Sequence, residues 1–400
     1  HTSYILLHTI TMQQHPIPQN ITSYQFRLIG DMTLKQFLEL VAGVGLGILF
    51  FKTNLIFPIK IFFTLFFILF GFALQRGRFC MNSAIRDTIL LQDTTLLKGV
   101  FVAILVGMFG FGVMAFSGLI KFSPTPLFWG ANLVGGIVFG IGMVLAGGCA
   151  SGITYRVGEG MVGALSALIG LAAAGTLTAM GFLAPIKNAL QTNTKVMVGE
   201  ANPTLANIFG LPNDVVAVVL AIILAIVWFV IARKNREDSE PASGDLVKRI
   251  FKKGWAWLPT GIVIGLINML AFYLSTLAGR SYPLAITSGW IGIVKVIFAV
   301  PDSKLGWDAF LVIGIIIGAF IAAIIASEFK IRWPGWKLVI QTLIGGLLMG
   351  FGAVTSAGCN VTHILSGLPQ LGLGSLLGAI SIVIGAWLAA YVIFVRRQKE

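Results

Sequence analysis

The chain has 400 residues, of which 57% are hydrophobic and only 11% are charged. Its mean hydropathy is +0.92, whereas about a quarter of the residues of a soluble domain are charged, so an ordinary soluble protein is excluded. The formal net charge of +13 does not indicate nucleic-acid binding, because basic residues beside apolar runs mark the cytoplasmic border of a membrane. Runs long enough to cross ~30 Å of hydrocarbon must be helical. The sequence therefore predicts an all-α polytopic integral membrane protein.

Apolar runs recur along the whole chain. Two of them, 160–184 and 284–300, are too short or too rich in glycine to be predicted as complete crossings, so broken or re-entrant helices are expected there. In membrane proteins with internal repeats, broken helices at matching places usually mark a substrate site. The 48 glycines also fit close helix packing in lipid. In chain order, the expected segments lie near 37–51, 55–75, 97–120, 128–148, 160–184, 214–232, 256–277, 284–300, 308–326, 337–357 and 372–395.

A polar and basic segment divides the chain. Residues 233–253 read RKNREDSEPASGDLVKRIFKK, with seven basic against four acidic side chains. Such an excess of Lys and Arg places the segment on the cytoplasmic side, together with the basic loop 328–337 and the tail 396–400. The loop between Lys187 and Asp214 is expected outside.

This pattern predicts four regions: an N-terminal extension over 1–54, a first half over 55–235, a cytoplasmic linker over 236–254 and a second half over 255–400. If linker and tail share one side, the second half crosses the membrane an even number of times. That count favours parallel over inverted halves.

Three cysteines lie in glycine-framed motifs, and two of the frames are near-copies. The stretch GGIVFGIGMVLAGGC ends at Cys149 and GGLLMGFGAVTSAGC ends at Cys359, an offset of 210 residues (359 − 149). A shorter echo, GFALQRGRFC, ends at Cys80. A fourth site, AGRSYPLAITSGW (278–290), resembles the first motif with Tyr282 where a cysteine would stand. A duplication with a thiol at the same place in each copy indicates two pseudo-symmetric halves whose cysteines line a shared path.

From Gly77 onward the motifs resemble the YeeE/YedE family, membrane proteins that move thiosulfate or related sulfur compounds inward. The resemblance rests on QRGRFCMNSAIRD (75–87), AGGCASGITYRVGEG (146–160) and SAGCNVTHILSGLPQLGLGS (356–375). These motifs frame about 300 residues, 75–375, in the right order. The resemblance implies a multi-pass protein of a prokaryotic cytoplasmic (inner) membrane that imports thiosulfate. It also implies a small cytosolic sulfur-carrier partner of the TusA type, besides contact with membrane lipid.

The family's three cysteines correspond to Cys80, Cys149 and Cys359. Thiosulfate is a small dianion with one soft terminal sulfur. A free thiol has a pKa of ~8.5 and is mostly S–H at neutral pH, so neutral thiols along a pore can pass the sulfur on through contacts weak enough to release it. Helix N-termini beside the glycine-rich turns favour anions, and nearby arginines add positive potential. The further candidate substrate-binding residues are Gly148, Gly358, Asn360, His363, Arg78, Arg156 and Arg280.

Each of these residues also has a structural interpretation. A buried cysteine is commonly a small hydrophobe, and arginines are ordinary at membrane borders. His363 can simply hydrogen-bond a helix end, and Glu159 is expected to pair with Arg156, because an unpaired charge there would be expensive. The odd number of cysteines argues against a structural disulfide. A metal site at Cys359 and His363 is disfavoured, since no compact zinc-type spacing is present.

Three classes of function remain open. The leading one is a transporter for thiosulfate or a related anion, with a selenium compound as the alternative substrate. A thiol-based membrane redox protein is the second class, but no CxxC pair or cofactor motif is present, and no cofactor is expected. The third is a structural component of a secretion complex. The transporter interpretation predicts that the chain is not an enzyme.

The third class rests on the N-terminal extension alone. From Met12, the run MQQHPIPQNITSYQFRLIGDMTLKQFLELVAGVGLGILFF resembles the start of PrgI-family proteins, two-helix membrane proteins associated with secretion machinery. The similarity covers roughly residues 12–70. Because the join falls within continuous apolar sequence, a chimeric reading frame is the alternative. We expect the extension to be dispensable for the function of the cysteines.

Overall fold

The computed structural model describes residues 57–199, 201–234 and 250–395, together with 27–29 and 32–33. The chain divides into two compact units, His1–Leu55 and Ile56–Glu400. In the first unit, β1 (Arg27–Ile29) and β2 (Met32–Thr33) form an antiparallel pair. The remainder of the PrgI-like extension, including the expected run 37–51, lies outside the described residues, as does most of the linker.

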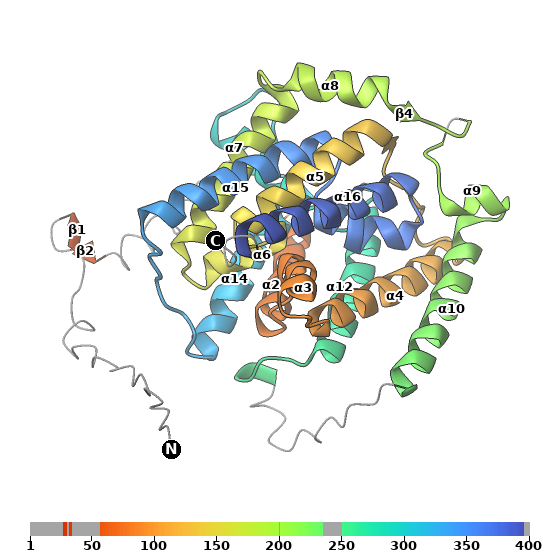
Figure 1. Ribbon diagram of the computed structural model, residues 1–400, viewed down its shortest axis with the longest axis horizontal. Helices are drawn as coiled ribbons and strands as arrows, with labels where there is room; N and C mark the ends of the chain where they lie inside the picture. Colours follow the sequence, from red (N-terminus) through yellow and green to blue (C-terminus); the bar gives the residue numbers. More distant parts are fainter. Residues whose placement is uncertain (1–26, 30–31, 34–56, 200, 235–249, 396–400) are drawn as a thin grey trace, which may run out of the picture. The chain divides into compact units, whose positions relative to one another are not determined.

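The larger unit is helical, with one series of helices before the linker and one after it (Figure 1). A two-stranded antiparallel ribbon, β3 (Leu127–Phe128) with β4 (Lys195–Val196), joins loops of the first stretch. The helices before the linker are α2 (Phe57–Arg76), α3 (Met81–Leu90), α4 (Thr95–Phe116), α5 (Trp129–Leu145), α6 (Ala150–Gly158), α7 (Val162–Met180), α8 (Ala184–Asn193), α9 (Leu205–Phe209) and α10 (Asn213–Lys234). Those after it are α12 (Trp257–Leu277), α13 (Ile286–Ile297), α14 (Trp307–Ile325), α15 (Trp336–Thr355), η2 (Val361–Gly367), η3 (Leu368–Gln370), α16 (Leu373–Ala390) and η4 (Tyr391–Val395).

Within the described residues, nine helical stretches are long and apolar enough to cross a membrane. The all-α polytopic class predicted from composition is therefore confirmed. The run 160–184 was expected to be an incomplete crossing, and this is wrong: α7 has 19 residues and qualifies as a full span. Its glycines and alanines serve close packing instead of breaking the helix. The run 284–300 does contain only a short helix, the 12 residues of α13.

The two halves pack in a way that repeats. Helix α7 packs along α15 as α16 packs along α5, and α14 packs along α2 as α4 packs along α12. Helices α5 and α15 pack on each other at the centre, and Figure 1 shows α7, α15, α5 and α16 side by side. Exchanging each helix with its counterpart leaves this set of contacts unchanged. The pseudo-two-fold relation expected from the duplicated motifs is thus present in the packing.

Glycines set the separation at the central contact. A Cβ on Gly142 would lie 2.6 Å from the carbonyl oxygen of Gly345, and one on Gly352 would lie 2.6 Å from that of Gly135. No carbon atom fits at such a distance, so only glycine lets the two backbones approach this closely. Apart from Gly148 and Gly358, the glycines shared by the two motif copies therefore lie at the interface between the halves.

The direction of each helix follows from its neighbours. Trp255 N–H donates to the carbonyl oxygen of Arg76 at 2.9 Å, so α2 ends where α12 begins. We call this end of the bundle the linker face and the opposite end the outer face. Along α5 and α15, Gly135 lies against Ser356 whereas Gly142 lies against Gly345. These two helices are therefore antiparallel.

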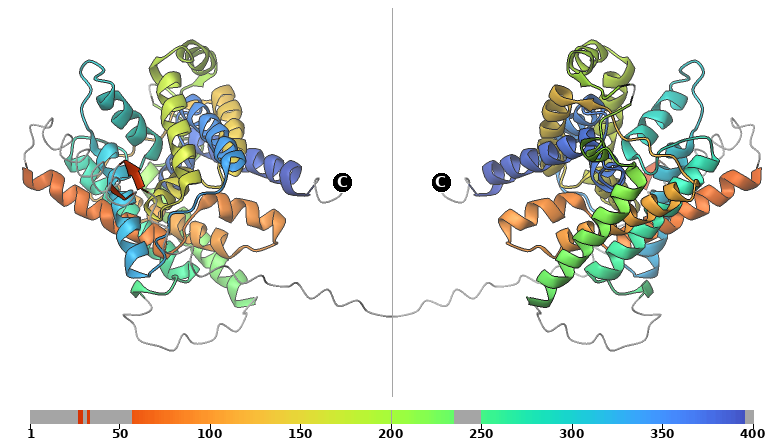
Figure 2. Two further views of the ribbon diagram at one scale, coloured as in Figure 1. Left: turned by 90° about the vertical axis from the view of Figure 1, so that its left-hand side faces the viewer. Right: turned by 90° about the vertical axis from the view of Figure 1, so that its right-hand side faces the viewer.

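Antiparallel counterparts make the repeats inverted, because a two-fold axis that relates them must lie across the helices and so in the membrane plane. The expectation of parallel halves was wrong. Among the described residues, four candidate spans lie in the second half and five in the first, where α10 is an additional span that returns the chain to the linker face. Its start lies against Gly112 and its end stacks Trp228 on Phe101 at 5.0 Å. In the right-hand view of Figure 2, α10 (green) lies in front of the other helices.

Candidate thiol site

The thiols of Cys80 and Cys149 meet in the interior. Their Sγ atoms are 3.7 Å apart, and both side chains are buried. Each cysteine is the residue immediately before a short helix, Cys80 before α3 and Cys149 before α6. The Cys149 sulfur also accepts a hydrogen bond from Gly152 N–H at 3.3 Å and lies 3.4 Å from the Ser151 hydroxyl. Residues 69 positions apart thus form one thiol pair at the N-termini of two helices.

The turns that precede the cysteines share one backbone geometry. The residue two positions before each thiol has positive φ: Arg78 (46°), Gly147 (70°) and Ala357 (61°). This left-handed residue ends the long helix and lets the chain start a short one. Long helix, left-handed turn, cysteine and short helix therefore recur at all three motifs. Each of the first two broken helices falls within one stretch that is long and apolar enough to cross a membrane, Phe63–Leu90 and Trp129–Gly158.

The predicted glycines act by leaving space. A Cβ on Gly358 would lie 2.9 Å from His363 Nε2, and one on Gly148 would lie 3.1 Å from a guanidinium nitrogen of Arg156. Both glycines lie directly before a cysteine. They allow a polar side chain from the following helix to fold back over the turn.

Cys359 lies beside the hydroxyl of Thr362, at 3.6 Å from sulfur to oxygen. Its neighbour Asn360 connects this turn to the thiol pair. The Asn360 amide donates to Met81 Sδ at 3.0 Å, and its oxygen accepts from Ala150 N–H at 3.3 Å. Met81 and Ala150 each follow one of the paired cysteines. Asn360 therefore joins all three cysteine motifs.

His363 is fully buried under Gly378. Its Nε2 lies 3.0 Å from the carbonyl oxygen of Ser356, the residue after α15. Because a carbonyl only accepts, Nε2 is the protonated nitrogen of the ring. The hydrogen bond to a helix end that was the structural interpretation of His363 is present, while its Nδ1 has no partner among the described residues.

The three predicted arginines differ in their surroundings. Arg78 is 73% exposed and lies 3.6 Å from Glu328. Arg156 donates to the carbonyl oxygen of Gly147 in the second cysteine turn instead of pairing with Glu159, so the expected pair of these two residues is not the contact that forms. Arg280 donates to the carbonyl oxygens of its own turn and pairs with an aspartate.

A polar network at the linker face was missed by the sequence analysis. The amide of Gln75 donates to Glu159 at 3.1 Å and to Glu328 at 2.7 Å. Arg76 is 1% exposed, pairs with Glu328 and donates to the carbonyl oxygen of Lys252 at 3.2 Å. Gln75 and Arg76 open the first motif, QRGRFC, and were visible there. Their partners come from loops far away in sequence, which no local pattern reveals.

The pKa values of the two carboxylates in this network shift in opposite directions. Burial raises the pKa of Glu159, and this exceeds the opposing effects of Gln75 and Arg156. Burial also acts to raise the pKa of Glu328, but the hydrogen bond from Gln75 and the charge of Arg76 outweigh it and hold that pKa below its usual value. Glu328 is thus the more firmly ionised carboxylate.

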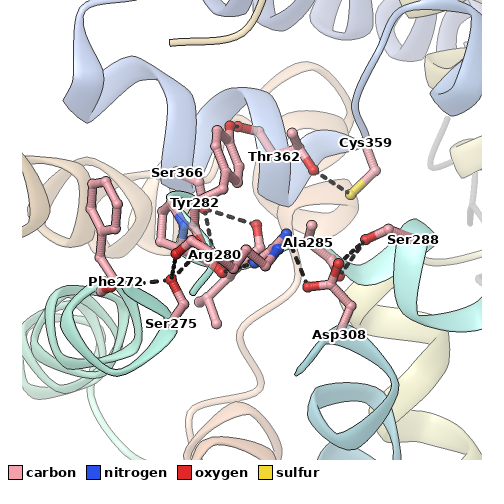
Figure 3. A network of polar contacts seen from close by, with 12 residues as sticks. Phe272, Ser275, Arg280, Tyr282, Ala285, Ser288, Asp308, Cys359, Thr362 and Ser366 are labelled. Carbon is pink, nitrogen blue, oxygen red and sulfur yellow. Dashed lines mark hydrogen bonds and ion pairs between the residues drawn. The ribbon is translucent and has the colours of Figure 1, made fainter. Parts of the chain in front are cut away.

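The fourth motif departs from the other three. Its left-handed residue is Gly279 (φ 80°), but α13 begins only at Ile286, so the residue before the short helix is Ala285. Tyr282, aligned with a cysteine by sequence, lies within this longer turn. Its hydroxyl donates to the carbonyl oxygen of Thr362 at 2.8 Å, beside Cys359 (Figure 3). An aromatic side chain from one half therefore reaches the cysteine turn of the other.

Inverted repeats with broken helices that meet near the centre are typical of secondary membrane transporters. The chain belongs to the sulphur transport family (the YeeE/YedE proteins), whose model matches residues 76–388. It is therefore a multi-pass membrane transporter and not an enzyme. The PrgI-like extension lies before the matched residues, and the comparisons do not show that resemblance.

Curated relatives agree with this assignment. The chain is 39% identical over 337 residues to the thiosulfate transporter TsuA of Spirochaeta thermophila, covering 82% of this chain and 97% of the relative. It is 31% identical to the thiosulfate transporter TsuA of Escherichia coli over 335 residues, 83% of this chain and 94% of the relative. A probable transporter YedE of Escherichia coli is 30% identical over 161 residues, 35% of this chain and 39% of the relative.

Proposed function

We propose that this protein imports thiosulfate, or a closely related sulfur anion, across a prokaryotic cytoplasmic membrane and guides it past Cys80, Cys149 and Cys359. The observation behind the proposal is the buried pair of thiols 3.7 Å apart at the N-termini of two short helices. A purely apolar packing role would not require two cysteines to meet there. Two relatives that bear the name thiosulfate transporter support this substrate.

The helix N-termini suit an anion. The N–H groups of the first turn and the helix dipole favour negative charge at the start of α3 and of α6. The thiols add soft, weakly donating groups that match the terminal sulfur of thiosulfate and bind it loosely enough for release. A helix terminus alone would accept any small anion, so the thiols would distinguish thiosulfate from sulfate.

The inverted repeat supports one order of the three thiols along the proposed relay. Helix α15 ends toward the outer face, where Gln191 donates to the carbonyl oxygen of Thr355, and Cys359 comes four residues later. Helix α5 ends toward the linker face, and Cys149 comes four residues after Leu145. Import would then run from Cys359 to the Cys149 and Cys80 pair. A TusA-like carrier would receive the sulfur at the linker face, for which the excess of basic residues in the linker favours the cytoplasmic side.

The test is uptake by cells that express the whole chain, supplied separately with labelled thiosulfate, sulfate or selenite. We expect uptake of thiosulfate well above that of sulfate, because sulfate lacks the soft terminal sulfur. Cells with the same expression vector but without the gene provide the background. Uptake of selenite without thiosulfate would reassign the substrate to a selenium compound, and no uptake of either would refute the proposal.

A further inference from the structure

An ion pair near the outer face is not explained by the relay. Arg280, in the turn after α12, lies 3.0 Å from Asp308, the second residue of α14. The pair lies at the ends of helices that meet the outer face, on the side from which an imported anion arrives. Figure 3 shows Arg280 between Asp308 and Tyr282. Both charged side chains are partly accessible, at 27% and 16%.

The backbone holds the Arg280 guanidinium in place. One terminal nitrogen donates to the carbonyl oxygens of Tyr282 at 2.7 Å and of Pro283 at 2.8 Å. The other terminal nitrogen faces Asp308. Among the described residues, no acceptor is hydrogen-bonded to Nε. An arginine anchored on one side, whose Nε has no acceptor and whose other terminal nitrogen makes only an ion pair, is a suitable site for an oxyanion.

Asp308 forms an ion pair with the remaining side of the guanidinium. Its Oδ2 accepts from the Ser288 hydroxyl at 2.6 Å. Its Oδ1 lies within ion-pair distance of Arg280 but has no directed hydrogen bond in the described part of the chain. The attraction between the two charges is therefore not reinforced by the paired geometry that makes arginine–carboxylate contacts strong.

The site is connected to the third thiol. The Arg280 guanidinium carbon lies 5.8 Å from the centre of the Tyr282 ring, and the Tyr282 hydroxyl donates to Thr362. The Thr362 hydroxyl lies 3.6 Å from Cys359 Sγ. Tyr282 therefore links Arg280 to Thr362, which lies beside Cys359, the outermost thiol of the proposed relay.

We propose that Arg280 is the first binding site for a small dianion on the outer side and that Asp308 is a built-in competitor for it. The arriving dianion replaces the Asp308 carboxylate on the guanidinium, and the Ser288 hydroxyl becomes free to donate to the anion. Asp308 thereby neutralises the charge of Arg280 while no substrate is present. It also lowers the apparent affinity of the site for the dianion, which must displace the carboxylate. This inference rests on the proposed function for the identity of the substrate, but not for the presence of an anion site.

The direct test is Asp308→Asn, assayed for thiosulfate uptake over a range of concentrations. Removing the competitor is expected to lower the half-saturating concentration roughly tenfold, as for a typical coupling between two ligands, with little change in maximal rate. Asp302→Asn is the matched control: it removes a carboxylate six residues earlier in the exposed turn before α14, where a positive φ of 58° suits asparagine. It should leave half-saturation unchanged.

A second measurement does not depend on transport. In purified Asp308→Asn protein, thiosulfate and sulfate should each raise the unfolding temperature more than in the wild type, because either dianion compensates the unpaired Arg280 charge. Chloride at equal ionic strength is the control. In the double variant Arg280→Gln, Asp308→Asn, which leaves no unpaired charge, the dianion should no longer protect.

The outcomes separate the two proposals. An unchanged or raised half-saturation in Asp308→Asn, or an equal gain in Asp302→Asn, would overturn the role of Asp308. Dianion protection that persists in the double variant would remove Arg280 as the site. Should the wild type import no thiosulfate while dianions still protect Asp308→Asn, the proposed function would fail and the anion site would stand.

Discussion

Gly152 provides the sharpest test of the thiol pair. This residue lies in α6, three positions after Cys149, and a Cβ there would lie 2.7 Å from Cys80 Sγ and 3.2 Å from Cys149 Sγ. An ordinary contact requires about 3.5–4.0 Å, so Gly152→Ala must push the Cys80 sulfur by about 1 Å. The added methyl group would lie beside both sulfurs of the thiol pair on the proposed path.

The expected cost to stability is modest. Overpacking of a core by one carbon typically costs about 1–3 kcal/mol, and alanine recovers roughly 0.5–1 kcal/mol over glycine inside a helix. The protein should therefore fold and reach the membrane, but thiosulfate uptake should fall at least about tenfold, which corresponds to about 1.4 kcal/mol added to the transport barrier. Uptake, membrane level and unfolding temperature would be measured together.

Two further variants make this prediction specific. Gly292→Ala adds the same methyl group in α13, where nothing lies within 4 Å of the new Cβ, and uptake should remain normal. Combining Gly152→Ala with Cys80→Ala removes the clashing sulfur, so stability should recover while uptake stays low. Normal uptake in Gly152→Ala at normal protein level would show that the space between these thiols is not on the substrate path.

Three other predictions follow from the same structure. The double variant Cys149→Ser, Cys359→Ser should lose nearly all uptake at near-normal thermal stability, and the single losses should not add, because steps in series fail together; full uptake would exclude a cysteine relay. A chain that begins at Phe50 should transport as well as the whole chain, and a transport defect at normal membrane level would show that the N-terminal segment is required. Glu328, whose pKa lies below its usual value, contributes stability that is complete above its unfolded pKa of ~4.3 and is lost as the pH falls through the lower folded pKa. Glu328→Gln should remove that acid-sensitive contribution, and an unchanged pH profile of the unfolding temperature would contradict it.

The sequence by itself determined the class of protein and the position of its motifs. Apolar runs force helices in lipid whatever their neighbours, because backbone groups have no other partner there. The glycine frames around Cys149 and Cys359 revealed the duplication, since close backbone contact tolerates no side chain at those positions. Features that depend on residue type and local spacing were therefore predictable, including the glycine-framed turns before the three cysteines and the short helix within 284–300.

The tertiary structure alone decided how these parts meet. Whether the halves are parallel or inverted depends on one additional span, α10, which hydropathy does not distinguish from a repeat helix. The approach of Cys80 to Cys149, and of Tyr282 to the turn of Cys359, depends on the lengths of turns and on packing between helices far apart in the sequence. The same holds for Glu328 and Asp308, whose arginine partners are brought to them by the packing of α14 on the rest of the bundle. Such contacts join residues that are far apart in the sequence, so no local sequence pattern predicts them.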